Sequence, residues 1–325
     1  IGAGASGGRV PGGRLRGGLA GMPLPLAAGV PTWCGMSEAS PSPLFATLLP
    51  APLARPLKRA IVAEVRGLFN DAARGERPVA RREDGWFGPG SVAWRLHGDV
   101  AAMMVGGMAG LLLQMLHPAV LAGVWDHSDF RADMSGRLRR TARFIALTTY
   151  GGPEEAAAVA ARVRGIHARV RGVLPDGTPY AADDPALLAW VHVTEVVSFL
   201  EAGMRYAAPD LSAAEQDRYV AEMARVGEAL GAAPVPRSRG EARRLIEAMR
   251  PGLRCDGRTR EVAGLVLSPG TGKAEPLRAL AGRAAVDLLP LWARRMHGLE
   301  VPLLAAPLVR GGVRGVARTL RWAFA

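Results

Sequence analysis

The chain has 325 residues, of which 49% are hydrophobic, so it is long enough to bury a large core without a partner. Its net charge is +12, but the basic residues are almost all single arginines and no run of five or more occurs, which disfavours nucleic-acid binding. The 2 cysteines show no CxxC spacing, which disfavours a disulfide framework and a thiolate zinc site and fits a reducing compartment.

The first 35 residues are dominated by Gly, Ala and Pro and begin with Ile rather than Met. A chain this rich in glycine cannot offset the entropy of ordering itself, so we expect a disordered extension over residues 1–50. A secretory signal is disfavoured because prolines interrupt the apolar stretch and no clear cleavage site follows. Met36 is the expected true start, and the helical domain is expected over residues 51–325.

From Pro56 onward, apolar residues return every three or four positions, which predicts helices. The first amphipathic helix is expected over residues 56–75, followed by a loop that ends in the turn-forming sequence GPGS. The longest apolar run is Val100–Leu113, after which a His-Pro pair follows. This run is shorter than the roughly 20 residues that cross a bilayer. A buried central helix, broken before Pro118, is therefore favoured over a transmembrane segment.

Sequence signals also mark where the later helices begin. Pro153 and Pro185 are expected at first helical positions, the second of them after Asp184 as the N-cap. The patterns SAAE (212–215) and SRGE (238–241) are capping boxes that predict two further helix starts. Only EVAGLVLSPG resembles a strand, and it stands alone. We therefore predict a single, all-α domain with no internal linker.

Histidines are the candidate metal or cofactor ligands of this chain. No HExxH motif occurs, no two histidines stand four residues apart, and no carboxylates cluster near them as in a di-iron bundle. Zinc and di-iron sites are therefore weakly supported. Haem needs only one axial imidazole on a helix beside an apolar slot, since the porphyrin provides the remaining nitrogens. The candidates are His97, His117, His127, His167, His192 and His297.

His167 suits the role of an iron ligand. On a continuous helix, Val163 and Val170 make one flank of this histidine apolar, while Arg164 and Arg171 make the other flank cationic. Apolar contacts for the porphyrin and guanidinium groups for its propionates fit a haem site. The pattern also fits an ordinary amphipathic helix with a histidine at its boundary, and the spacing alone favours that interpretation.

Several sequence blocks point in the same direction when they are taken together. They read WFGPGSVAWRLHGD, LLQMLHPAVLAGVWDHSDF, RLRRT, IHARVRG, DGTPYAADDPALLAWVH and EAGMRY. In this order, from about Trp86 to Tyr206, they resemble the DUF2236 family, the catalytic domain shared by latex-clearing rubber oxygenases and MpaB-type oxygenases. The resemblance extends to about Pro251, so the expected family core is about residues 86–251. The set is specific, although each block alone is weak.

This resemblance implies a globin-like helical fold that binds haem b, and chemistry that uses O2. The best-known members cleave carbon–carbon double bonds of isoprenoid chains. Matched residue by residue, the family's Arg-x-x-x-Thr falls on Arg137 and Thr141, and its proximal haem ligand falls on His167, the expected metal ligand. Its further histidines fall on His117, His127 and His192.

The chain departs from the pattern of the rubber oxygenases at two places. Arg140 stands where those enzymes carry a lysine, just before the threonine. Only Asp126 and Asp129 are near the position of their proposed acid/base glutamate.

The combined expectation is a haem-dependent oxygenase that acts with O2 on an apolar substrate, isoprenoid or lipid-like. Arg137 and Thr141 are expected to donate hydrogen bonds to bound oxygen or to the haem edge, and Asp126 to remove a proton from the substrate. His127 is a further catalytic candidate. A structural role is nevertheless favoured for His127 and for His117, which is positioned to cap the helix break. The expected cofactor-binding residues are His167, Arg164, Arg171, His117 and His192.

The alternative is a non-catalytic helical protein bound peripherally to membranes. The C-terminal stretch LLAAPLVRGGVRGVARTLRWAFA places arginines between apolar residues, as in interfacial anchors. The two readings are compatible, because an isoprenoid or lipid substrate is most easily reached from a bilayer surface. A dinucleotide-dependent oxidoreductase is disfavoured, since no GxGxxG follows a predicted strand. We expect a cytoplasmic protein with no nucleic-acid partner, and leave membrane association open.

Overall fold

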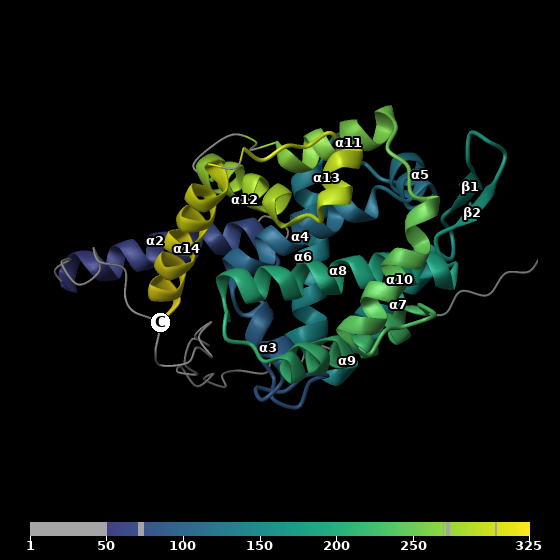
Figure 1. The fold of residues 1–325 in the computed structure, drawn as a ribbon. Helices are drawn as coiled ribbons and strands as arrows, with labels where there is room; N and C mark the ends of the chain where they lie inside the picture. The colour runs from purple at the N-terminus through teal and green to yellow at the C-terminus, as the bar shows by residue number, and fades with distance from the viewer. Residues whose placement is uncertain (1–50, 71–74, 269, 271–273, 303) are drawn as a thin grey trace, which may run out of the picture. The chain divides into compact units, whose positions relative to one another are not determined.

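The computed structural model describes residues 51–70, 75–268, 270, 274–302 and 304–325, which are mostly helical (Figure 1). This confirms the all-α prediction, while the expected extension over residues 1–50, with Met36, lies outside the described residues. The elements are α2 (Ala51–Phe69), α3 (Val92–His97), α4 (Val100–Gln114), α5 (Pro118–His127), α6 (Met134–Tyr150), α7 (Pro153–His167), β1 (Arg171–Val173), β2 (Pro179–Ala181), α8 (Pro185–Tyr206), α9 (Ala213–Leu230), α10 (Arg239–Met249), the 3₁₀ turn η2 (Arg250–Gly252), α11 (Gly257–Leu267), α12 (Glu275–Leu288), α13 (Leu291–His297) and α14 (Ala305–Phe324).

The predicted helix starts are confirmed where a local cap specifies them. Pro153 and Pro185 occupy first-turn positions, and the Asp184 carboxylate accepts hydrogen bonds from two backbone N–H groups of α8. Ser212 and Glu215 form the predicted capping box at α9. At α10 only half of the box forms. Ser238 caps the helix, but the Glu241 carboxylate accepts from the N–H of residue 237 instead.

Three expectations about secondary structure are wrong. The first helix begins at Ala51 and ends at Phe69, so Pro56 lies inside it. The stretch EVAGLVLSPG is not a strand: most of it continues α11, whose Val262 and Val266 are buried one turn apart in the core. A short apolar run does not distinguish the two periodicities. The two-stranded antiparallel hairpin β1–β2, in which Gly172 pairs with Tyr180, was not expected.

The predicted central helix is confirmed as α4, which makes its most extensive contacts with α8 (Figure 1). Glycines allow the two backbones to approach closely. A Cβ atom added to Gly106 would lie 2.7 Å from Cδ1 and 3.0 Å from Cα of Phe199. The predicted break is also confirmed, since α5 begins at Pro118 and is bent by 104° relative to α4.

Within the described residues, α8 is long and apolar enough to cross a membrane, and the bent pair of α4 and α5 passes the same test when taken together. However, 67% of the apolar window of α8 is buried against other helices. Core helices of this kind meet the same criterion, so length and hydropathy give only weak evidence for a membrane span.

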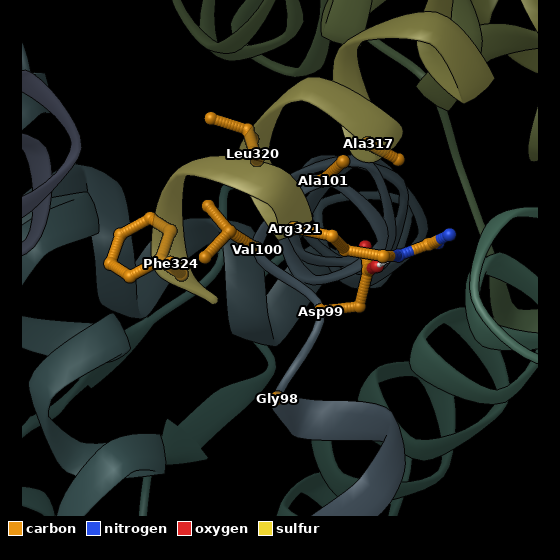
Figure 2. Close-up of a pocket in the computed structure, with 8 residues that line it drawn as sticks. All are labelled: Gly98, Asp99, Val100, Ala101, Ala317, Leu320, Arg321 and Phe324. Atoms are coloured by element: carbon orange, nitrogen blue, oxygen red, sulfur yellow. Dashed lines mark hydrogen bonds and ion pairs between the residues drawn. The ribbon is translucent and has the colours of Figure 1, made fainter. Parts of the chain in front are cut away.

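The C-terminal helix α14 is held to the core by two buried carboxylates. Asp287 on α12 binds Arg205 (2.9 Å) and Arg310 (2.7 Å). Asp99, the N-cap of α4, binds Arg321 at 2.8 Å. Figure 2 shows this second pair beside a small cavity between α4 and α14, whose volume of about 10 Å³ leaves room for a single water molecule. This cavity is too small for a cofactor.

Candidate functional site

Five neighbouring segments bring most of the predicted site residues into one region, which we call the outer polar cluster. The segments are the end of α5, the start of α6, the end of α7, the hairpin, and the turn before α8. Three contacts link four of these segments: Arg137 donates to Ser128 (2.9 Å), His127 pairs with the Arg171 carbonyl (3.1 Å), and Arg171 pairs with Asp183 (2.8 Å). The charges of Arg137 and Asp183 act on His167 at the end of α7, the fifth segment. The residues of the cluster are Asp126, His127, Ser128, Arg137, His167, Arg171, Tyr180 and Asp183.

His167 is the last residue of α7 and is half-buried. Its Nδ1 atom is buried and has no hydrogen-bond partner among the described residues. Burial lowers the pKa of His167, while the charge of Asp183 raises it and that of Arg137 lowers it further. The imidazole is thus favoured in its neutral form, the form that can coordinate a metal.

The surroundings expected for His167 are only partly correct. The sequence pattern assumed a helix that continues to residue 171, but α7 ends at His167 and the chain then enters β1. Val170 and Arg171 therefore do not lie on the same helix as His167. Arg164 does lie one turn before it, with an exposed side chain, whereas Arg171 pairs with Asp183.

Arg137 and Thr141 lie one turn apart on α6, as their spacing predicted. The Arg137 guanidinium is half-buried, and its pKa is lowered by burial and then by the charge of Arg140. Thr141 is exposed, and its hydroxyl donates to the Arg137 carbonyl (3.2 Å). Of these two residues, Arg137 is the charged one, and its charge lowers the pKa of His167.

Asp126 and His127 are the last two residues of α5, and both form hydrogen bonds with the β1–β2 hairpin. The Tyr180 hydroxyl donates to the Asp126 carboxylate at 2.8 Å. Burial and this hydrogen bond raise the pKa of Tyr180 to about 12, so the tyrosine keeps its proton at neutral pH. Tyr180 was not recognised in the sequence, because its partner lies 54 residues away.

Tyr180→Phe is expected to lower the free energy of unfolding by about 1 kcal/mol, because the hydrogen bond to Asp126 is lost. Urea denaturation measures this change. Asp126→Asn is the matched control: its amide oxygen still accepts from Tyr180, so the loss should be smaller. Equal losses in the two variants would show that this hydrogen bond does not anchor the hairpin.

His117 lies at the N-cap of α5, but its side chain makes no capping hydrogen bond, so the expected capping role is wrong. Its Nδ1 atom is buried without a partner in the described part of the chain. The ring lies 6.3 Å from that of Trp190, centroid to centroid. Burial lowers the pKa of His117, and the nearby charge of Asp184 opposes this effect.

His192 faces α9 rather than the outer polar cluster. Its Nε2 atom lies 2.9 Å from the place that a Cβ on Gly227 would occupy, so the ring fills the space this glycine leaves. Burial lowers the pKa of His192 to about 4. This placement is that of a neutral core residue packed between two helices.

A second group of polar residues, which we call the inner polar cluster, consists of His97, Thr149, Glu195 and Tyr219. His97 was among the candidate histidines of the sequence, but the cluster was not predicted. His97 is buried and hydrogen-bonded through both ring nitrogens, to Thr149 (2.7 Å) and to the Tyr219 hydroxyl (2.9 Å). Glu195 on α8 interacts electrostatically with Tyr219. Burial raises the pKa of Glu195 to about 7. A lone carboxylate in the apolar stretch WVHVTEVVSFL, three residues after His192, was the signal that could have revealed it.

Helix α6, which carries Arg137 of the outer polar cluster and Thr149 of the inner polar cluster, has few fully buried side chains. Only Gly136 and the last three residues of this helix are buried. Its apolar Leu138, Phe144, Ile145 and Leu147 are half-buried, although an amphipathic helix normally buries such residues. Part of the apolar surface of α6 is therefore left exposed by the described residues.

The side chains available as metal ligands differ between a site built from several side chains and a haem held by one imidazole. Within the described ranges, no group of three or more His, Cys, Asp or Glu side chains is arranged to hold a metal ion. A centre with one protein ligand requires only a single available imidazole. His167 meets that requirement, with its unpaired Nδ1 and its neutral ring, and the half-buried α6 provides apolar surface. The residues present fit haem better than a side-chain metal site.

The fold defines an all-α protein. Over residues 94–322 the chain matches the family model described as ER-bound oxygenase mpaB/B'/Rubber oxygenase, catalytic domain. The chain belongs to this oxygenase family, as the sequence blocks suggested. The match runs from α3 into α14, beyond residue 251, where the expected family core ended. Comparisons with curated proteins and with solved structures gave no match.

Proposed function

We propose that this oxygenase depends on haem b, held through its iron by His167, and that it acts with O2 on an apolar substrate of isoprenoid or lipid-like character. The observation that carries the proposal is the His167 imidazole, whose buried Nδ1 has no partner among the described residues and whose pKa is lowered mainly by burial. The apolar face of α6, left half-buried by protein, supports the same assignment.

Each residue of the outer polar cluster has a defined part in this proposal. Haem would supply the binding and activation of O2. Burial lowers the pKa of His167 most, and the charge of Arg137, whose guanidinium binds Ser128, lowers it further. Arg164, exposed one turn before His167, is available to pair with a propionate.

Asp126 is the proposed proton acceptor for substrate. Tyr180 donates a hydrogen bond to its carboxylate and, with a pKa of about 12, remains protonated while doing so. The carboxyl group of Asp126 is thereby held in one orientation, with lone pairs left to accept a proton. His127 binds the Arg171 carbonyl and positions the hairpin beside this acid.

His167→Ala is expected to abolish haem binding. The test is the visible spectrum and the haem content of the full chain, purified after haem supplementation, with circular dichroism to confirm the fold. His297→Gln is the matched control, because His297 is a buried histidine whose Nε2 pairs with the Leu112 carbonyl (2.9 Å), a contact that glutamine can reproduce. The control should retain the haem band.

Two results would contradict the proposal. One is a wild-type protein that stays colourless after haem supplementation. The other is a folded His167→Ala variant that retains the wild-type haem content. In the second case, His117→Ala would identify whether His117, whose Nδ1 is also buried without a partner among the described residues, is the ligand.

A further inference from the structure

The exposed leucines of this protein are concentrated on two helices. Seven large hydrophobic side chains are exposed among the described residues, and four of them lie in α2, in α14 or at the N-cap of α14. These two helices pack against each other (Figure 1). The four are Leu53 (58% exposed), Leu57 (38%), Leu304 (89%) and Leu308 (78%). Surface leucines occur singly in most proteins, so this grouping calls for an explanation.

The outward face of α14 combines leucines with two arginines that have no acidic partner among the described residues. The helix buries Val309, Val313, Ala317, Leu320 and Phe324, while positions 304, 308, 311, 314, 315 and 318 are exposed at helical spacing. Arg314 and Arg318 are the exposed charges of that face. The other two arginines of α14 are engaged by Asp287 and Asp99. No acidic residue occurs in α14.

The first half of α2 has the same character. Between residues 52 and 60, only positions 54 and 58 are partly buried. Leu53 and Leu57 are exposed there beside Arg55 and Arg59. The ammonium group of Lys58 lies 5.1 Å from the ring centroid of Trp322, which ties this half of α2 to the end of α14. Glu64 is the single carboxylate of α2 and lies beyond this half.

We propose that α2 and α14 form a docking surface for an anionic phospholipid bilayer. Leucines on the outward faces would enter the boundary between headgroups and acyl chains, and Arg55, Arg59, Arg314 and Arg318 would bind lipid phosphates. Charge complementarity selects this occupant, because the two exposed faces carry arginines next to leucines and α14 carries no acid. The proposal is independent of haem, and its readout is binding to lipid.

The test is flotation of the purified full chain with vesicles of phosphatidylcholine alone or mixed with phosphatidylglycerol. Binding should require phosphatidylglycerol and should weaken as salt rises from about 0.1 M to about 1 M, where screening is strong. Arg314→Gln with Arg318→Gln should reduce the partition coefficient about tenfold. Leu304→Ser with Leu308→Ser should reduce it by about the same factor, because buried apolar area is lost.

Two control variants test whether vesicle binding requires this surface rather than any exposed arginine or leucine. Arg243→Gln with Arg244→Gln removes two exposed arginines on α10, and Leu291→Ser removes a leucine on α13 that is 53% exposed. Neither should alter flotation. Circular dichroism and the melting temperature confirm that each variant is folded.

Three outcomes would overturn the proposal. The first is no flotation with anionic vesicles. The second is flotation that the α14 variants leave unchanged, as expected if another part of the chain covers the leucines. The third is a wild-type protein that does not bind vesicles but forms a dimer, which the α14 variants lose in sedimentation velocity. That result would assign the surface to a second copy of the chain.

Discussion

Replacing Gly106 by alanine is expected to lower the free energy of unfolding by about 3 kcal/mol, because a new Cβ has no space between α4 and α8. That atom would lie 2.7 Å from Cδ1 of Phe199, and 3.0 Å from both its Cα and the Ser198 carbonyl oxygen. The aromatic ring can rotate, but the two backbone atoms move only if the helices separate. Urea denaturation monitored by circular dichroism measures the effect.

Gly107→Ala is the control, since it changes the neighbouring residue of the same helix. Its Cβ would lie 3.6 Å or more from the ring atoms of Phe199, which is ordinary van der Waals contact. Alanine favours a helix over glycine, so this variant should gain about 0.5 to 1 kcal/mol. If both variants were equally stable, the close approach of α4 to α8 would not be a constraint on the fold.

Glu195→Gln is expected to stabilise the protein by about 3 kcal/mol at pH 8 and by almost nothing near pH 4. The carboxylate has a pKa of about 7 in the folded protein against 4.5 in an ordinary environment, because burial disfavours its charged form. Between these values the folded protein holds a proton that the unfolded chain has lost. Wild-type stability therefore falls as the pH rises from 4.5 to about 7, and glutamine removes that slope.

The measurement is the free energy of unfolding at several pH values for the wild type and for Glu195→Gln, both without haem. Glu64→Gln, which removes an exposed carboxylate of α2, is the control and should follow the wild-type curve. A constant difference between Glu195→Gln and wild type across this range would show that Glu195 is not a desolvated acid.

Features set by neighbouring residues could be predicted from the sequence, and features set by distant contacts could not. The caps at Asp184 and Ser212 are local, so their helices begin where the sequence indicated. The end of α7 was misplaced because the residues after His167 are held by a hairpin rather than by an intrahelical ladder. The pairing of Gly172 with Tyr180 has no distinct pattern in sequence.

The candidate site, like the fold, has residues that could be predicted from the sequence and residues that could not. His167 and Arg137 were found through their family blocks, and in the structure the charge of Arg137 acts on the His167 imidazole. Asp183 and Tyr180 join them only through packing of the hairpin and the turn before α8, which no spacing rule encodes. The carboxylate of Glu195 was visible in the sequence, but its desolvation depends on the helices that surround it.

The anchoring of α14 has a consequence for biosynthesis. Asp99 precedes its partner Arg321 by 222 residues. Until α14 has been synthesised and has docked, Asp99 lacks its arginine and Asp287 lacks one of its two, and a buried charge without its partner is costly. The domain is therefore expected to close only after α14 has been made, and chains that stop before this helix would be the ones exposed to chaperones and proteases.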